Sequence, residues 1–189
     1  LSILIQDPTR DAAAQTGSLL DLLKIRALWF IFPVMFVNYM AAAGIRGLWI
    51  GPYLSDIFAM TTGQIGTASL VMGLAMIAGT LAYGPADRLF KTRKWVVLGG
   101  NFIAALALFA LAGALSASSM LSILLMAAVG FFGASFPVII AHARSSFPPH
   151  LTGRGVTLMN LFGIGGVGIM QFVSGRVHSS LVATDTALA

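Results

Sequence analysis

The sequence predicts an all-α, polytopic membrane protein, and three observations support that prediction. The chain is 58% hydrophobic and only 9% charged, whereas an ordinary soluble domain carries about 25% charged residues. Its apolar residues gather in blocks close to the ~20 residues that a helix needs to cross a hydrocarbon core. The blocks do not alternate polar and apolar residues, as the strands of a membrane barrel would. Helices pair their own backbone groups, which lipid requires.

Five membrane-spanning helices are expected in order along the chain. They are expected at Ala27–Gly51, Ile65–Gly84, Trp95–Leu115, Met120–Ala141 and Val156–Val173. Polar connections are expected at Asp56–Gly63, Pro85–Lys94, Ser116–Ser119 and Arg144–Gly155. Connections this short predict antiparallel neighbours.

The segments that flank these helices are expected to be a linker and a loop. Residues 1–26 begin with LSILIQDPTR, which reads as the end of a preceding helix that runs into a polar linker. Ser18 and Asp21 have the spacing of a capping box, so a helix is expected to begin near Ser18. Residues 179–189 contain no apolar run and are expected to be a loop, which leaves 27–178 for the five spans. Because the chain begins at Leu1 rather than Met, we expect a piece of a longer protein.

The positive charge lies almost entirely on one side of the expected bundle. If the first span begins in the cytoplasm, every Lys and Arg is cytoplasmic except Arg46, which lies within a span, and Arg176, which lies outside. Cytoplasmic loops carry an excess of Lys and Arg. This orientation places the linker and the 85–94 connection in the cytoplasm and the chain in a cell membrane. The net charge of +5 is spread between apolar blocks, which argues against nucleic acid as a partner.

The connection after the second span resembles a signature loop of the major facilitator superfamily. Its residues read Gly84-Pro-Ala-Asp87-Arg88-Leu-Phe-Lys91-Thr-Arg93-Lys94. The family pattern has a Gly, then Asp-Arg, a second Gly and a group of cations. Here Gly84 lies three residues before Asp87 rather than four, and Phe90 stands in place of the second Gly.

The resemblance extends to the order and orientation of the spans. In the family the loop joins helices 2 and 3 and recurs, more weakly, between helices 8 and 9. Matching the second copy makes this chain helices 7–11 of a twelve-helix bundle, the C-terminal half of a bacterial-type permease of the inner membrane. The N-terminal six helices and helix 12 would then be missing. GLWIGPYLSD at 47–56 and FPPHLTGRGVTLMN at 147–160 also resemble bacterial members.

The resemblance implies secondary transport of a small solute by alternating access, with the solute site near the midplane. Transport would be coupled to a proton or another ion, or would exchange one solute for another. The signature loop would act as a conformational latch with Asp87 as its anchor and Arg88 as a partner. Its remaining residues are Gly84, Lys91, Arg93 and Lys94. The alternative for Asp87 is a solvated loop residue.

Four polar residues within the spans are candidates for the solute cavity. Arg46 is the strongest of these candidates, because a charge at membrane depth is costly and usually faces a cavity or a partner. A guanidinium there favours an anionic solute, and its alternative is to extend to the outer headgroups. Asn38 and Tyr39 precede it in the same span, and Gln171 lies in the last. For Asn38 and Gln171 the alternative is hydrogen bonding between helices.

Other classes of function have weaker support. The chain has no Cys, no metal-binding cluster and no phosphate-binding loop, so no metal, cofactor or ATP site is expected. A membrane scaffold or sensor with the same fold is the first alternative to a transporter. An intramembrane enzyme would need Ser135 and His142 within hydrogen-bond reach, and His142 is also a weak candidate for a proton relay. Gly163–Gly168 is expected to allow close helix packing or to act as a hinge.

Overall fold

The computed structural model describes residues 18–114 and 117–188, and over these residues the protein is all-α. The described part contains helices and no strand. It includes five helical segments long and apolar enough to cross a membrane, namely Arg26–Phe58, Thr62–Phe90, Arg93–Gly113, Ser119–Arg144 and Pro149–Val182. Each overlaps one of the five expected blocks, which confirms the predicted fold class.

Three of the spans are built from more than one element. The first consists of α2 (Arg26–Gly44), a π-helical turn η1 (Ile45–Trp49) and α3 (Ile50–Phe58). The fourth consists of α6 (Ser119–Phe132) and α7 (Phe136–Arg144). In the fifth, a short 3₁₀ turn η2 (Pro149–Leu151) leads into α8 (Thr152–Leu188), while α4 (Thr62–Phe90) and α5 (Arg93–Gly113) are continuous.

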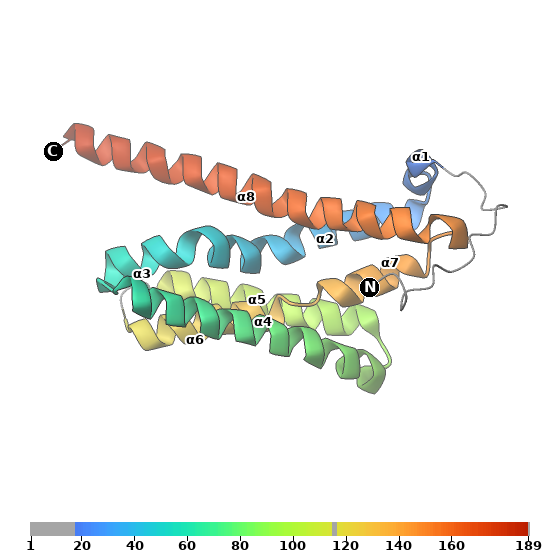
Figure 1. Ribbon diagram of the computed structural model, residues 1–189, viewed down its shortest axis with the longest axis horizontal. Coiled ribbons are helices and arrows are strands. Elements are labelled where there is room, and N and C mark those ends of the chain that lie inside the picture. The colour runs from blue at the N-terminus through green and yellow to red at the C-terminus, as the bar shows by residue number, and fades with distance from the viewer. Residues whose placement is uncertain (1–17, 115–116, 189) are drawn as a thin grey trace, which may run out of the picture.

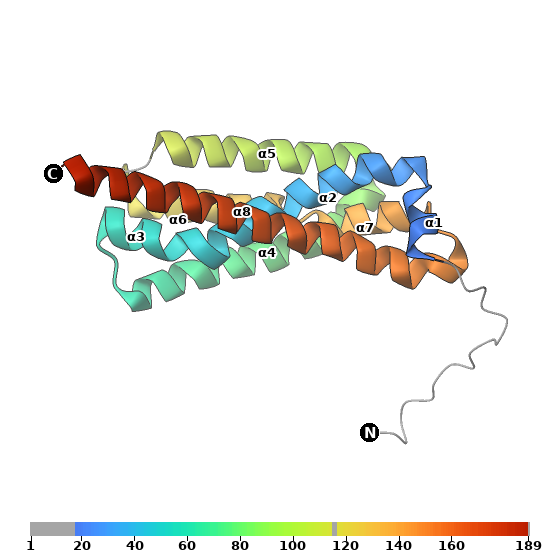
Figure 2. The same ribbon diagram turned by 90° about the horizontal axis from the view of Figure 1, so that it is seen from above.

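The helices form two groups that lie against each other (Figure 1). One group pairs α8 with α2, which share the most extensive contact, and α3 at the end of the same span packs against α4 of the other group. In the other group α6 packs against both α4 and α5, which lie on its two sides in Figure 2. Two clusters of buried side chains hold the groups together, one around Phe32, Val138 and Met159 and one around Leu54, Met72 and Val129.

One end of the bundle collects most of the described cations. The connection between α4 and α5, the end of α7 and the start of α8 meet there, beside α1 (Leu19–Leu23) (Figure 1). We call it the cation-rich end, and the elements that meet there carry Lys24, Arg26, Arg88, Lys91, Arg93, Lys94, Arg144 and Arg154.

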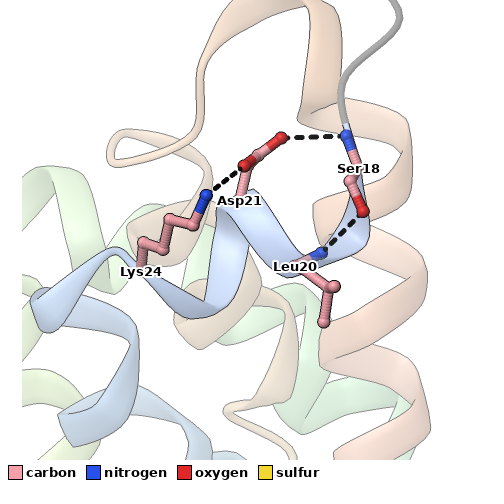
Figure 3. Close-up of polar contacts among 4 residues, drawn as sticks. All are labelled: Ser18, Leu20, Asp21 and Lys24. Atoms are coloured by element: carbon pink, nitrogen blue, oxygen red, sulfur yellow. Dashed lines mark hydrogen bonds and ion pairs between the residues drawn. The ribbon is translucent and has the colours of Figure 1, made fainter.

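The predicted capping box at Ser18 is confirmed, and it begins α1 (Figure 3). The Ser18 hydroxyl accepts a hydrogen bond from the Leu20 amide at 3.2 Å, and the Asp21 carboxylate accepts one from the Ser18 amide at 2.9 Å. The Lys24 ammonium lies 2.8 Å from the same carboxylate. This hydrogen bond from Lys24, together with that from Ser18, holds the pKa of Asp21 below its usual value.

Two expected boundaries are wrong, and both errors underestimate helix. The connection expected at 85–94 shrinks to Lys91 and Thr92, because α4 continues through Pro85 to Phe90. Ala86, Arg88 and Leu89 are good helix formers, and a proline withholds one backbone hydrogen bond.

The tail expected as a loop from residue 179 is helical up to Leu188. No Gly or Pro follows Gly175, and the hydroxyls of Ser179 and Ser180 donate to the carbonyls of Gly175 and Val177 within the helix. The expected end of a preceding helix, at residues 1–10, lies outside the described residues.

Candidate functional site

Arg46 lies on the π-helical turn of the first span, and its side chain reaches across to α4. The residue is exposed. A methyl group placed on Gly73 of α4 would lie 3.5 Å from the Arg46 Nε and 3.6 Å from its Nη2. The guanidinium therefore lies beside Gly73, within van der Waals range of its Cβ position. Together they line a groove of about 390 Å³ whose remaining wall is Leu70, Leu74, Met76, Ile77, Thr80 and Leu81.

The contact with Gly73 fixes the depth of the guanidinium along the bundle. Gly73 follows the start of α4 by 11 residues, or about 17 Å of helix. It lies roughly 5 Å from the midpoint of α4. A side chain directed to the outer headgroups would instead meet the first turns of α4. The charge of Arg46 is thus placed near the middle of the span, and within the described residues no carboxylate pairs with it.

Gln171 meets the same π-helical turn from α8. The residue is half-buried, and its Nε2 would lie 3.0 Å from a methyl group placed on Gly47, the neighbour of Arg46. One turn further along α8, the Ser174 hydroxyl accepts a hydrogen bond from the Trp49 indole at 3.0 Å. The turn η1 is therefore bracketed by α4 on the Arg46 side and by α8 on the Gln171 side.

Asn38 lies in a different environment, because it is buried among three elements. Its side-chain amide donates to the Asn101 Oδ1 of α5 at 2.6 Å and to the Ser135 Oγ, between α6 and α7, at 2.7 Å. The structure thus connects Asn38 to α5 and α7, and Arg46 to α4. The half-buried Tyr39 packs its ring 5.2 Å from that of Phe136.

The break between α6 and α7 explains the role of Tyr83, a residue that the sequence analysis did not single out. Pro137 has no amide hydrogen, so the helix cannot pass through this segment with all its carbonyls paired. The Tyr83 hydroxyl of α4 donates to the Phe132 carbonyl at 2.6 Å. A proline in the middle of an apolar block was the available signal, because carbonyls freed in lipid need donors from neighbouring helices.

Ser135 and His142 are not arranged as a nucleophile and a base. Ser135 is fully buried at the start of α7 and His142 is exposed in its last turn. Seven residues of helix separate them by about 10 Å, well beyond a hydrogen bond. The hydroxyl of Ser135 is also engaged with Asn38. Among the described residues there is also no group of three His, Cys, Asp or Glu that could hold a metal ion.

The signature residues lie at the cation-rich end, on the last two turns of α4, the connection that follows it and the first turn of α5. Gly84 and Arg88 belong to α4, Lys91 has a left-handed backbone conformation with φ of 52°, and the Lys94 ammonium lies 5.5 Å from the centre of the Trp95 ring. A side chain on Gly84 would meet nothing within 4 Å. The backbone of Asp87 belongs to α4, while its side chain is outside the described part of the structure.

The fold and the site define a polytopic, all-α integral membrane protein with a cation near the middle of its first span. Residues 31–182 match the family model of the Major Facilitator Superfamily. This range covers most of the chain, and the chain belongs to that superfamily of transporters. No curated protein and no solved structure matches the chain at a significant level.

Proposed function

We propose that this chain is helices 7–11 of a twelve-helix secondary transporter that moves a small anionic solute by alternating access. The observation that carries the proposal is the position of Arg46, which is exposed near the midplane beside Gly73. A charged side chain at such depth costs roughly 2.5–3.5 kcal/mol on insertion scales. An anionic solute bound to the guanidinium would offset that cost and gain bidentate hydrogen bonds.

The walls of the groove narrow the class of solute. Apart from Arg46, Gly73 and Thr80, the lining residues are large and apolar. Binding sites commonly combine an apolar wall with a few polar groups that fix orientation. We therefore favour a solute with one anionic group and an apolar body. Gln171 lies on the other side of η1 and does not line this groove, so it is not proposed as a contact of the same solute.

The test compares two variants of Arg46 with a matched change at Arg176, in the full chain that contains this segment. Small carboxylates and phosphate esters are first screened for those that raise the thermal stability of the purified protein, as a ligand of the folded state must. Arg46→Lys keeps the charge but loses the planar fork, so we expect it to weaken solute binding at least tenfold, and Arg46→Gln to abolish it.

Arg176→Lys is the control, because Arg176 lies over the Phe172 ring on the outer face of α8. It should leave solute affinity and uptake unchanged. Equal solute affinity and uptake in the parent and in Arg46→Lys would refute the substrate role of Arg46.

The cation-rich end is proposed to be cytoplasmic and to hold the conformational latch. Its support is the excess of Lys and Arg there and the position of Asp87 in the last turns of α4. Asp87→Asn should slow turnover without abolishing solute binding, and unchanged turnover would leave Asp87 as a solvated residue.

If transport is coupled to protons, we place the coupling carboxylate in the N-terminal half. Asp56 and Asp87 both lie near the ends of their spans.

A non-transporting scaffold or sensor is the second candidate, and the mostly apolar groove around Arg46 favours it. The two candidates differ in the screen described above. A transporter of this class should bind a solute and carry it into vesicles, a sensor should bind it without carrying it, and a scaffold should do neither.

A further inference from the structure

A second hollow lies outside the proposed solute site, at the cation-rich end. It has a volume of about 650 Å³ and is lined by Arg88, Lys91, Thr92, Arg93, Lys94 and His142. None of these residues is a carboxylate. Asp87 precedes Arg88, and one carboxylate would still leave an excess of positive charge. The chemistry of the hollow suits an anion with several oxygen atoms, such as a phosphate group.

An apolar groove continues from this hollow along the helices. Its volume is about 450 Å³, and its lining includes Tyr83, Phe90, Trp95, Gly99 and Ile103. Thr92 lines both the groove and the cationic hollow, so the two adjoin at the start of α5. The single Tyr83 hydroxyl is turned inward to the Phe132 carbonyl, which leaves hydrocarbon and aromatic surface on the wall.

The groove exists because two successive residues of α5 have no side chain. A methyl group on Gly100 would clash with the Tyr83 ring, whereas one on Gly99 would meet nothing within 4 Å. Gly99 thus opens the groove to the outside of the bundle, and Tyr83 closes its floor.

The length of the groove matches one leaflet of a bilayer. From Thr92 to Ile103 the helix α5 rises by about 17 Å, and half of a hydrocarbon core is roughly 15 Å. Trp95 is 67% exposed at the mouth, with the Lys94 ammonium beside its ring. Tryptophan prefers the boundary between headgroups and hydrocarbon, so the cationic hollow lies at headgroup level and the groove at acyl-chain level.

We propose that the two hollows together are a binding site for one anionic phospholipid. Its phosphate-bearing headgroup would bind the cations of Arg88, Lys91, Arg93 and Lys94, and one acyl chain would lie between α4 and α5. Basic pockets between membrane helices suit such headgroups, and the adjoining apolar groove distinguishes a lipid from a free phosphate. The inference does not depend on the solute or on transport.

The test measures fluorescence quenching of Trp95 in the full chain, reconstituted in phosphatidylcholine vesicles. The vesicles contain either brominated phosphatidylglycerol or brominated phosphatidylcholine at the same mole fraction. The signal of Trp95 is the difference between the parent protein and Trp95→Phe. We expect the brominated anionic lipid to quench Trp95 at a mole fraction several-fold lower than the zwitterionic lipid.

Two pairs of variants test the two halves of the site. Arg88→Gln combined with Lys91→Gln removes two cations and leaves Lys94 in place. Because each cation contributes roughly fivefold, the double change should abolish the several-fold anionic preference. Arg26→Gln combined with Arg154→Gln removes the same charge from α2 and α8 and should change it little.

A second comparison tests the apolar half of the site, by filling the groove without removing charge. Gly99→Leu should lower the quenching by both lipids several-fold. Gly113→Leu is the control, because it adds the same side chain to the far end of α5, where it also meets nothing within 4 Å.

Four results would overturn the proposal. Equal quenching by both lipids in the parent would mean no anionic site, and an equal effect of both charge pairs would mean general surface attraction. Loss of the preference when inorganic phosphate replaces chloride at constant ionic strength would mean a site for free anions. No quenching by either lipid would mean that another part of the protein covers the groove.

Discussion

The contact between α2 and α8 predicts opposite outcomes for two neighbouring glycines of α8. Gly166 faces α2, where an added Cβ would lie 3.0 Å from the Phe36 carbonyl carbon and 3.3 Å from its ring, and closer still to the carbonyl oxygen. Gly165 faces open space, with nothing within 4 Å of an added Cβ. Gly166→Ala and Gly165→Ala therefore make the same chemical change in two different surroundings.

The magnitude follows from the distances. Carbon atoms pack best at about 3.5–4.0 Å, so α8 would have to move away from the backbone of α2 by about 0.5–1 Å. Overpacking of this kind typically costs about 1–3 kcal/mol. Both substitutions also remove the roughly 0.5–1 kcal/mol disadvantage of Gly within a helix. Because that gain is common to both, the two variants should differ in stability by about 1–3 kcal/mol, with Gly166→Ala the less stable.

The assay is reversible unfolding of the purified full chain in mixed micelles, followed by far-ultraviolet circular dichroism. Gly163→Ala provides an intermediate case, because its Cβ would meet the flexible end of Met35 at 2.9 Å, which can move aside. The expected order of stability is Gly165→Ala, then Gly163→Ala, then Gly166→Ala. Equal stability of the first and last would refute the argument that Gly166 is required for close packing.

Four further predictions concern other parts of the structure. Asn38→Ala removes the donor shared by Asn101 and Ser135 and should lower the free energy of unfolding by about 1 kcal/mol. An unchanged free energy of unfolding would mean that other hydrogen bonds replace these two. Ala59 is exposed with φ of 50° at the end of α3, so Ala59→Gly should raise stability by about 1 kcal/mol, measured by the same unfolding assay. Ser18→Ala should speed hydrogen exchange of the α1 amides about fivefold. The lowered pKa of Asp21 means that its carboxylate stabilises the folded state above its ordinary pKa. That stabilisation is lost as the pH falls through the lowered value, so exchange of α1 should quicken there.

The spans could be predicted because lipid imposes a length and a composition that are visible without any neighbour. The cation-rich end could be predicted from the positions of Lys and Arg alone, and the capping box could be predicted from two residues that are three apart in the sequence. The helix boundaries at Phe90 and Leu188 could not be located in the same way. Polarity ends a membrane span but does not end a helix. The helix α4 continues through Gly84 and Pro85 to Phe90, and α8 meets no Gly or Pro after Gly175.

The faces of the helices could not be predicted because each block is apolar nearly all round. Asn38 and Arg46 are eight residues apart, a spacing that would place them on one face of a regular α-helix. The π-helical turn η1 lies between them in the structure, and it depends on packing against α4 and α8 rather than on a local motif. In the same way, Gly163 and Gly166 face α2 while Gly165 and Gly168 do not, and a run of glycines carries no signal that separates them.

The polar groups within the spans divide into two kinds, and this division supports the role proposed for Arg46. Asn38, Tyr83 and Trp49 each donate to a named acceptor on another element, and each such bond joins helices whose backbones are broken, bent or closely packed. Within the described residues Arg46 pairs with no carboxylate, and it lines a groove together with Gly73. A charge that only joined helices would be expected to have a partner on one of them. Space kept open beside an unpaired charge near the midplane is instead what a transported anion requires.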